Sequence, residues 1–231
     1  MVLARILSVE DFGRINFILS ISSVVAIILT TGLAHASTKY IPKFLSEGDL
    51  SSVKSYLSWS FMWMCAMSAV NSIILWIIIY FVSNKDVTNI LMGFFITIPP
   101  IMFWLWQRFF SLGFDYVGYA TVPRDIVYPL ASLLGLYLFP MEDFFDVLIL
   151  LNSILLFSIF IGAGVLLFKV RPVLNGAKTQ IKMKNIKEWH TASLSIGVSN
   201  ILILGMHSWD ILILGLLTSM GVVAKCNPPK N

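Results

Sequence analysis

Long stretches without a charged side chain are the most constraining feature of this sequence. No Asp, Glu, Lys or Arg occurs between Arg14 and Lys39, Lys54 and Lys85, Asp86 and Arg108, Asp146 and Lys169, or Glu188 and Asp210. Each interval exceeds the roughly 20 residues that a helix needs to cross about 30 Å of hydrocarbon. The intervals are continuously apolar, which favours helices over barrel strands, where apolar and polar residues alternate.

The composition excludes a soluble enzyme. Of the 231 residues, 12% are charged and 58% are hydrophobic, whereas a soluble domain carries about 25% charged residues. There are too few polar side chains to cover a globule of this size in water. The apolar content is too high for a disordered chain, and two cysteines are too few for a disulfide-stapled one. We therefore expect an all-α integral membrane protein.

About six transmembrane helices are expected. A weaker candidate, residues 122–139, begins with Arg124 and Asp125 but continues as an apolar run from Ile126 to Met141. Residues 207–210 contain neither Gly nor Pro, so one long helix from Thr191 to about Leu217 is favoured over two short crossings. The five spans before that helix cover about residues 15–35, 57–82, 87–107, 122–139 and 147–168.

Lys and Arg are divided unevenly between the two sides of the expected membrane. The side with three has Arg5, Arg14 and Lys85, before the C-terminal tail is counted. By the positive-inside rule the other side is cytoplasmic, which places Met1 and the acidic loop 140–146 outside. The eleven basic residues on the cytoplasmic side are Lys39, Lys43, Lys54, Arg108, Arg124, Lys169, Arg171, Lys178, Lys182, Lys184 and Lys187.

An outer N-terminus with no preceding span is an uncommon start for such a protein. One explanation is a cleavable signal that ends at the small-x-small sequence Ala34-His35-Ala36. Glu10, Asp11 and the length of the apolar run disfavour it. The other explanation is that a first transmembrane helix is missing from this chain.

Motifs near the N-terminus bear on this choice. The segment Arg5–Gly13 reads RILSVEDFG, the next span closes on Gly32-Leu33, and Lys39–Pro42 reads KYIP. This pattern resembles the start of the polysaccharide-biosynthesis flippases of the multidrug/oligosaccharidyl-lipid/polysaccharide exporter superfamily. In that family such a segment faces outward between the first and second helices, and the second helix ends on the cytoplasmic side. The resemblance implies that helix one is absent here, and it implies the orientation given by the charge count.

The C-terminal part resembles the same family more loosely. Trp189-His190 and a helix carrying Asp210–Gly215 are similar to the seventh helix, which opens the second lobe. The family's G-x-Y-x-x-A segment lacks its Tyr here, at residues 221–224. The resemblance implies that residues 1–170 are a first lobe without its first helix, 171–188 a basic cytoplasmic linker, 189–224 the truncated first helix of the second lobe, and 225–231 a polar tail. Such a chain is not expected to transport by itself.

Ionisable groups at membrane depth are the first candidates for a functional site, because they are costly there and usually line a pathway. Arg124 stands at the cytoplasmic start of the fourth span, with Tyr128 one turn later, and Arg108 follows the third span. A guanidinium pairs bidentately with phosphate, so these residues are candidates for binding a lipid-pyrophosphate headgroup. The alternative is that both arginines are interfacial and snorkel or pair locally.

A polar stripe follows the last helix. Ser193, Gly197, Asn200 and His207 lie within an arc of about 80°, with Asp210 about 60° beyond. Asn200 is a candidate for substrate binding, and His207 or Asp210 for coupling to protons or sodium. The alternative is that His207 and Asp210 lie near the outer interface.

Other features suggest structural roles. Pro99-Pro100 removes two helical donors from the middle of a span, which predicts a kink that is either a hinge or static. Ser158 and Gly162 suit close helix packing. The histidines and cysteines lack metal-ligand spacing, so no metal or cofactor is expected. Four tryptophans are expected to be packing or interfacial residues: Trp63, Trp76, Trp104 and Trp106.

The connector Lys169–Lys187 carries six basic residues and is expected to face anionic lipid headgroups rather than nucleic acid. By resemblance, the protein is a fragment of a flippase in the cytoplasmic membrane that moves a lipid-linked oligosaccharide or polysaccharide repeat, with glycan-assembly proteins as possible partners. One rival is a drug or cation antiporter of the same superfamily, but no span carries an acid in its middle. Another is a polytopic membrane enzyme of glycan assembly, but the outer loops are short and offer few catalytic groups.

Overall fold

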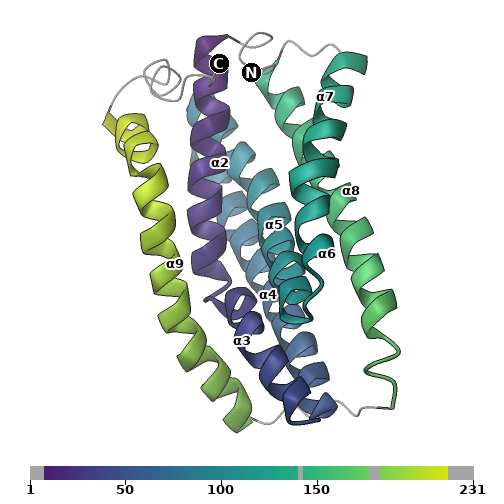
Figure 1. Ribbon diagram of the computed structural model, residues 1–231. Coiled ribbons are helices and arrows are strands. Elements are labelled where there is room, and N and C mark those ends of the chain that lie inside the picture. The colour runs from purple at the N-terminus through teal and green to yellow at the C-terminus, as the bar shows by residue number, and fades with distance from the viewer. Residues whose placement is uncertain (1–7, 140–142, 177–182, 218–231) are drawn as a thin grey trace.

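The computed structural model describes residues 8–139, 143–176 and 183–217, and in the last helix the side chains of residues 185–203. Helices make up most of these ranges, and no strand occurs within them. Long helices lie side by side along one axis (Figure 1). The elements are α2 (Val9–Leu29), α3 (Leu33–Ser46), α4 (Leu50–Phe81), α5 (Lys85–Gly113), α6 (Val117–Val122), the π-helix η1 (Pro123–Val127), α7 (Tyr128–Leu138), α8 (Phe144–Val170) and α9 (Met183–Leu217).

Four helices have the length and hydropathy of membrane crossings, which makes this a multi-pass membrane protein. They are Glu10–Leu29, Leu50–Phe81, Lys85–Gly113 and Phe144–Val170. The expected all-α membrane class is thereby confirmed. Crossings by residues 117–138, where α6, η1 and α7 follow one another, and by α9 remain predictions. The helix α9 runs unbroken through residues 207–210, as the absence of Gly and Pro there predicts.

The predicted first span, residues 15–35, is wrong at its end. The helix α2 stops at Leu29, and the chain turns through Thr31 and Gly32, whose φ angles are 48° and 72°. Only glycine adopts such left-handed angles without strain, so Gly32 ends the crossing although the surrounding run is uniformly apolar. A separate helix, α3, follows.

The helices α4 and α5 are longer than the spans predicted from hydropathy. The predicted spans 57–82 and 87–107 correspond to α4 and α5, which begin at Leu50 and Lys85 and end at Phe81 and Gly113. A side-chain cap sets the start of α4, where the carboxylate of Asp49 accepts a hydrogen bond from the amide of Ser52 at 3.0 Å. Hydropathy marks the part of a helix that suits hydrocarbon, whereas caps and turns mark its ends. The helix α5 is also unbroken at Pro99-Pro100, so a hinge there stays a prediction.

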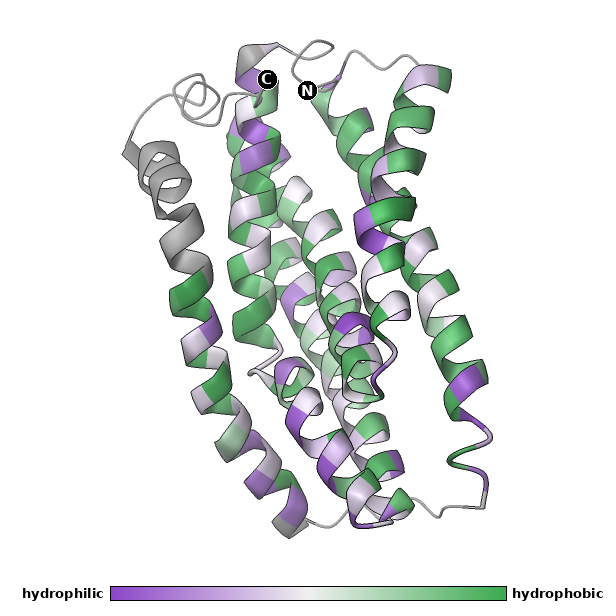
Figure 2. Ribbon diagram, viewed as in Figure 1, coloured by the Kyte–Doolittle hydropathy of each residue, from purple (hydrophilic) through white to green (hydrophobic). Residues whose placement is uncertain are grey.

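The helices alternate in direction, which brings their ends together in two groups. At one end Arg14 of α2 pairs with Glu10 at 2.7 Å, lies 4.0 Å from Asp86 of α5, and sits 5.7 Å from the Phe144 ring of α8. At the other end lie the α3–α4 connection, the end of α8 and the start of α9 (Figure 1). Hydrophilic residues gather there on α3 and α9 (Figure 2). Lys43 of α3, Lys54 of α4 and Lys169 of α8, which are predicted to face the cytoplasm, belong to helix segments at this end. Lys178 and Lys182 lie outside the described residues, and the side of the membrane stays a prediction.

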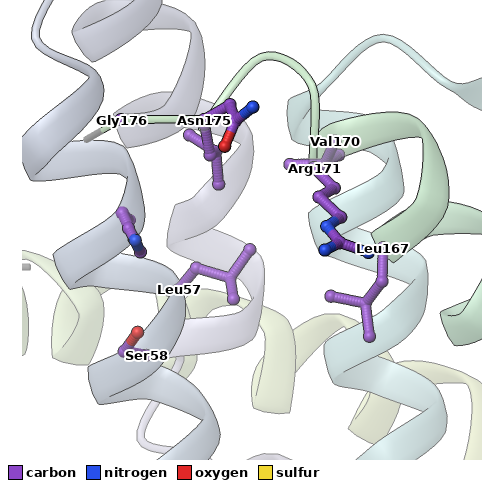
Figure 3. Close-up of a pocket in the computed structure, with 9 residues that line it drawn as sticks. Leu57, Ser58, Leu167, Val170, Arg171, Asn175 and Gly176 are labelled. Atoms are coloured by element: carbon purple, nitrogen blue, oxygen red, sulfur yellow. The ribbon is translucent and has the colours of Figure 1, made fainter. Parts of the chain in front are cut away.

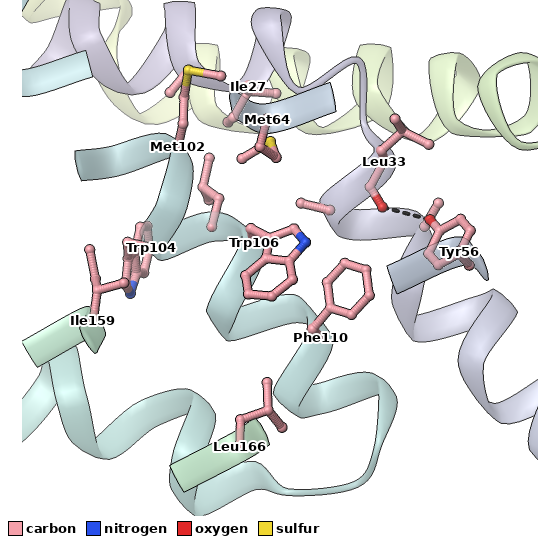
Figure 4. Close-up of a cluster of buried hydrophobic side chains, with 14 of the residues drawn as sticks. Ile27, Leu33, Tyr56, Met64, Met102, Trp104, Trp106, Phe110, Ile159 and Leu166 are labelled. Atoms are coloured by element: carbon pink, nitrogen blue, oxygen red, sulfur yellow. Dashed lines mark hydrogen bonds between the residues drawn. The ribbon is translucent and has the colours of Figure 1, made fainter. Parts of the chain in front are cut away.

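The helix α5 lies at the centre and packs against α2, α3, α4, α6 and α8. Its Trp106 donates a hydrogen bond to Ser60 of α4 at 3.0 Å, and its ring lies 4.9 Å from that of Phe110. Tyr56 is fully buried, and its hydroxyl donates to the Leu33 carbonyl at 2.7 Å (Figure 4). These bonds satisfy the polar atoms of large aromatic side chains, as burial requires.

Candidate functional site

A cavity of about 250 Å³ lies among α2, α3, α5, η1 and α9. Three residues predicted to bind substrate line it, although they come from different elements: Arg108 of α5, Arg124 of η1 and Asn200 of α9. His35 of α3 and Trp104 of α5 complete its polar and aromatic wall. The fold thus joins residues that are up to about 165 positions apart in sequence.

Two guanidinium groups share one indole ring in this cavity. The Cζ atom of Arg124 lies 3.8 Å from the centre of the Trp104 ring, and that of Arg108 lies 5.2 Å from the same centre. Arg124 is exposed, Arg108 is half-buried, and Trp104 is buried. A cation over an indole face is attracted by the ring quadrupole, so Trp104 holds both charges in place.

Neither of these arginines has a carboxylate within 4.0 Å among the residues that the structure describes. Arg14, by contrast, is neutralised by Glu10 and Asp11 at 2.7 and 3.7 Å. The Nε atom of Arg108 is buried without a hydrogen-bond partner. The Asp125 charge acts on Arg124 without forming a close ion pair. Two neighbouring cations that are not directly paired, in a partly apolar cavity, favour binding of an anion, and guanidinium geometry suits phosphate.

A π-helical turn presents Arg124. Proline lacks an N–H, so Pro123 leaves the Tyr119 carbonyl, four residues earlier, without its helical donor. The side-chain amide of Gln107 on α5 donates to that carbonyl at 2.5 Å, and Gln107 is fully buried. Single π-turns within α-helices are frequent at functional sites. The proline and the glutamine together fix the turn that carries Arg124 beside α5.

A glycine on α8 makes room for this arrangement. A Cβ atom on Gly162 would lie 2.8 Å from Nε2 of Gln107 and 3.0 Å from Cγ of Pro123. The prediction that Gly162 permits close helix packing is therefore confirmed. This close packing leaves room for Gln107 and Pro123, which shape the turn that carries Arg124. The sequence pattern did not indicate this role of Gly162.

His35 adds a neutral polar group. Its ring lies 3.9 Å from that of Phe109, and its Nδ1 atom has no hydrogen-bond partner. The residue belongs to α3, outside the four helices that suit a membrane crossing. Burial, with a smaller effect of the nearby Arg108 charge, lowers the pKa of His35 to about 4. The imidazole is thus uncharged at neutral pH, and the positive charge of the cavity comes from the arginines.

The helix α9 docks on the α2–α3 turn. A Cβ atom on Gly32 would lie 2.1 Å from the Ser193 carbonyl oxygen, so only glycine permits the approach. Trp59 of α4 donates a hydrogen bond to Nε2 of His190 at 3.2 Å. This docking turns the side of α9 that bears Ser193, Gly197 and Asn200 toward the other helices and brings Asn200 to the cavity.

The remaining predicted residues have different positions. Tyr128 is half-buried against the hydrophobic core and does not line the cavity. Tyr128 nevertheless lies close enough to Arg124 for the two side chains to interact electrostatically. The side chains of His207 and Asp210 lie outside the described residues. Trp104 was expected to pack or lie at an interface, and it also forms the cavity wall.

Sequence reasoning missed Trp104, His35 and Gln107 as parts of this site. Gln107 was visible as an uncharged polar residue next to Arg108 at the end of an apolar span. Nothing in the sequence showed that Trp104 would lie under both arginines. Among the described residues, no group of three or more His, Cys, Asp or Glu side chains is placed to hold a metal ion.

Comparison with known proteins identifies the family. The family model described as "Polysaccharide biosynthesis protein" matches residues 1–230. No curated protein and no solved structure matches the chain.

Proposed function

The chain belongs to the polysaccharide biosynthesis protein family, and from this premise we propose that it helps to move a lipid-linked oligosaccharide or polysaccharide repeat across the cytoplasmic membrane. Sugars and phosphate cannot enter hydrocarbon without a large loss of hydration free energy. A helical bundle with a polar cavity provides replacement contacts for these groups. The step breaks no covalent bond, so the proposed role is transport rather than catalysis.

The observation that carries this proposal is the pair of guanidinium groups on Trp104, at 3.8 and 5.2 Å from its ring centre. A pyrophosphate link between lipid and sugar offers several anionic oxygens, and Arg108 and Arg124 would bind them from two sides. The side-chain amide of Asn200 would bind the adjoining sugar or phosphate. A drug or cation antiporter would instead need acidic groups in this position.

The proposal extends to the organisation of the chain. Residues 1–170 would form one lobe, residues 171–188 a cytoplasmic linker, and residues 189–224 the opening helix of a second lobe. Alternating access would rock the lobes around the cavity. The coupling role of His207 and Asp210 and the hinge at Pro99-Pro100 belong to this same proposal.

Binding of farnesyl pyrophosphate, a short isoprenyl pyrophosphate, to the purified chain in lipid nanodiscs tests the site. Arg108→Gln and Arg124→Gln should each weaken binding about tenfold, because each removes charged hydrogen bonds to phosphate. Arg14→Gln is the matched control, since Arg14 is already paired with carboxylates. Wild-type affinity in the Arg108→Gln/Arg124→Gln double variant, or an equal loss in Arg14→Gln, would contradict the proposal.

A further inference from the structure

A groove runs between α4 and α8, on the side of α5 away from the arginine cavity. In the described part of the chain no Cα atom of α4 lies within 8 Å of one in α8, whereas α5 packs against both helices. Trp104 and Trp106 of α5 are about 200° apart around the helix. Trp104 faces the arginine cavity and Trp106 faces the groove.

The groove has a basic mouth at the end where α4 begins and α8 ends. Here a pocket of about 370 Å³ lies between Lys54 and Leu57 of α4 on one side and Leu167 of α8 and Arg171, which follows the end of α8, on the other. Figure 3 shows Leu57 and Ser58 on one side of it and Leu167, Val170 and Arg171 on the other. Arg171 is exposed and has no carboxylate within 4.0 Å among the described residues.

Beyond the mouth the groove becomes apolar. A second pocket, of about 290 Å³, is lined only by apolar and aromatic residues, among them Phe61 of α4, Trp106 of α5, and Phe160 and Ala163 of α8. Phe61 follows Leu57, and Ala163 precedes Leu167, by one helical turn, so the pockets follow one another along the same two helices. The side chains of Phe61 and Phe160 are 44% and 74% exposed, so the groove is open to its surroundings.

We propose that this groove binds an anionic phospholipid of the surrounding bilayer. The phosphate would lie at Lys54 and Arg171, and one acyl chain would follow Leu57 and Leu167 to Phe61 and Phe160. A ligand for this groove must combine a negative head with a long apolar chain, because the two pockets differ in that way.

The length of the groove distinguishes a phospholipid from a longer carrier lipid. Leu156, at the far end of the apolar pocket, and Arg171, at the mouth, are fifteen residues apart on α8 and its C-terminal turn. At about 1.5 Å per residue this is about 22 Å, which matches the headgroup region plus the roughly 15 Å of hydrocarbon in one leaflet. The basic end is also the predicted cytoplasmic end, and anionic lipids are concentrated in that leaflet. The inference is independent of the proposed transport function.

Native mass spectrometry of the purified, delipidated chain, titrated with phosphatidylglycerol or phosphatidylcholine, tests the basic mouth. The wild-type protein should retain phosphatidylglycerol preferentially. Arg171→Gln should lower its affinity for phosphatidylglycerol about fivefold and leave phosphatidylcholine unchanged. Lys43→Gln is the matched control, since Lys43 is exposed on α3 at the same end but outside the groove. Equal losses of phosphatidylglycerol affinity in Arg171→Gln and Lys43→Gln would show that general surface charge causes the binding, and would overturn the proposal.

A second pair of measurements tests the apolar part. Ala163→Phe fills the apolar pocket, and Phe61→Ser removes part of its wall, while both keep the charges at the mouth. Both variants should lose phosphatidylglycerol, whereas binding of glycerol phosphate, a headgroup without acyl chains, should not change. Wild-type lipid binding in both variants would show a headgroup site only, and displacement of phosphatidylglycerol by equimolar undecaprenyl phosphate would assign the groove to a carrier lipid. Either result would overturn the proposal.

Discussion

The guanidinium carbon of Arg124 lies 3.8 Å from the centre of the Trp104 ring, close enough for the cation to rest on the indole face. Arg108, from the same helix as Trp104, lies 5.2 Å from that centre. Two like charges near one another repel, and the shared ring partly offsets that repulsion. Trp104 therefore organises a cationic cavity in which, within the described part of the chain, neither arginine forms an ion pair within 4.0 Å.

Replacing Trp104 with Leu should weaken binding of farnesyl pyrophosphate about tenfold, because each cation–π contact contributes on the order of 1 kcal/mol and Leu has no π face. Isothermal titration in nanodiscs measures the change. Trp106→Leu is the control, since Trp106 lies on the other side of α5 and bonds Ser60. That substitution should lower thermal stability with little change in affinity. Equal affinity losses in both variants would contradict a specific role for Trp104.

His35 should make stability depend on pH. Burial and the Arg108 charge lower the pKa of His35 to about 4, whereas an unfolded histidine titrates near pH 6.5. The unfolded chain therefore takes up this proton first as the pH falls. The contribution of neutral His35 to the free energy of unfolding is therefore complete above about pH 6.5. It is lost progressively toward pH 4, by about 3 kcal/mol at most.

Thermal unfolding of the wild type and His35→Gln, measured from pH 7.5 to pH 4.5, tests this prediction. As the pH falls, the unfolding free energy of the wild type should decrease relative to that of His35→Gln, because only the wild type has this titrating group. Parallel stability curves would mean that His35 takes up its proton equally in the folded and unfolded states, and would contradict the prediction.

Sequence patterns predicted the membrane class and several cavity residues, because charge is expensive in hydrocarbon and an arginine in an apolar context has few other roles. Arg108 and Arg124 stand out for that reason, and Asn200 stands out because it belongs to the polar stripe of the last helix. Trp104 does not, since an aromatic residue in an apolar helix is ordinary, and only the tertiary fold shows what lies above its ring. The end of α2 was misjudged because hydropathy averages over the left-handed turn at Thr31 and Gly32.

Gln107 should be essential for the turn that carries Arg124. Gln107→Leu removes the donor to the Tyr119 carbonyl, which Pro123 already deprives of its helical partner. An unsatisfied buried carbonyl costs about 1–3 kcal/mol, so the thermal midpoint of unfolding should fall by several degrees. Affinity for farnesyl pyrophosphate should also fall, because Arg124 would lose its position.

Ser111→Ala is the control for Gln107→Leu. It removes the 3.4 Å contact from the Gln107 side chain to Ser111 and the 2.8 Å bond from the Ser111 hydroxyl to the Gln107 carbonyl, but keeps the side-chain bond to Tyr119. This variant should stay close to wild type in both measurements. A Gln107→Leu protein with wild-type stability and affinity would show that the side-chain bond does not hold the π-turn.

The contact between the α2–α3 turn and α9 offers a test that separates backbone strain from steric exclusion. Gly32 and Gly48 have nearly equal φ angles of 72° and 70°, so alanine at either position incurs similar left-handed strain, about 1–2 kcal/mol. A Cβ atom on Gly48 meets nothing within 4 Å, whereas on Gly32 it lies 2.1 Å from the backbone oxygen of Ser193. Gly32→Ala should therefore lower the unfolding midpoint clearly more than Gly48→Ala.

Gly32→Ala should also reduce disulfide cross-linking between Thr31→Cys and His190→Cys, whose wild-type side chains lie 3.5 Å apart. Equal midpoints and equal cross-linking in the two alanine variants would mean that α9 does not dock tightly on this turn.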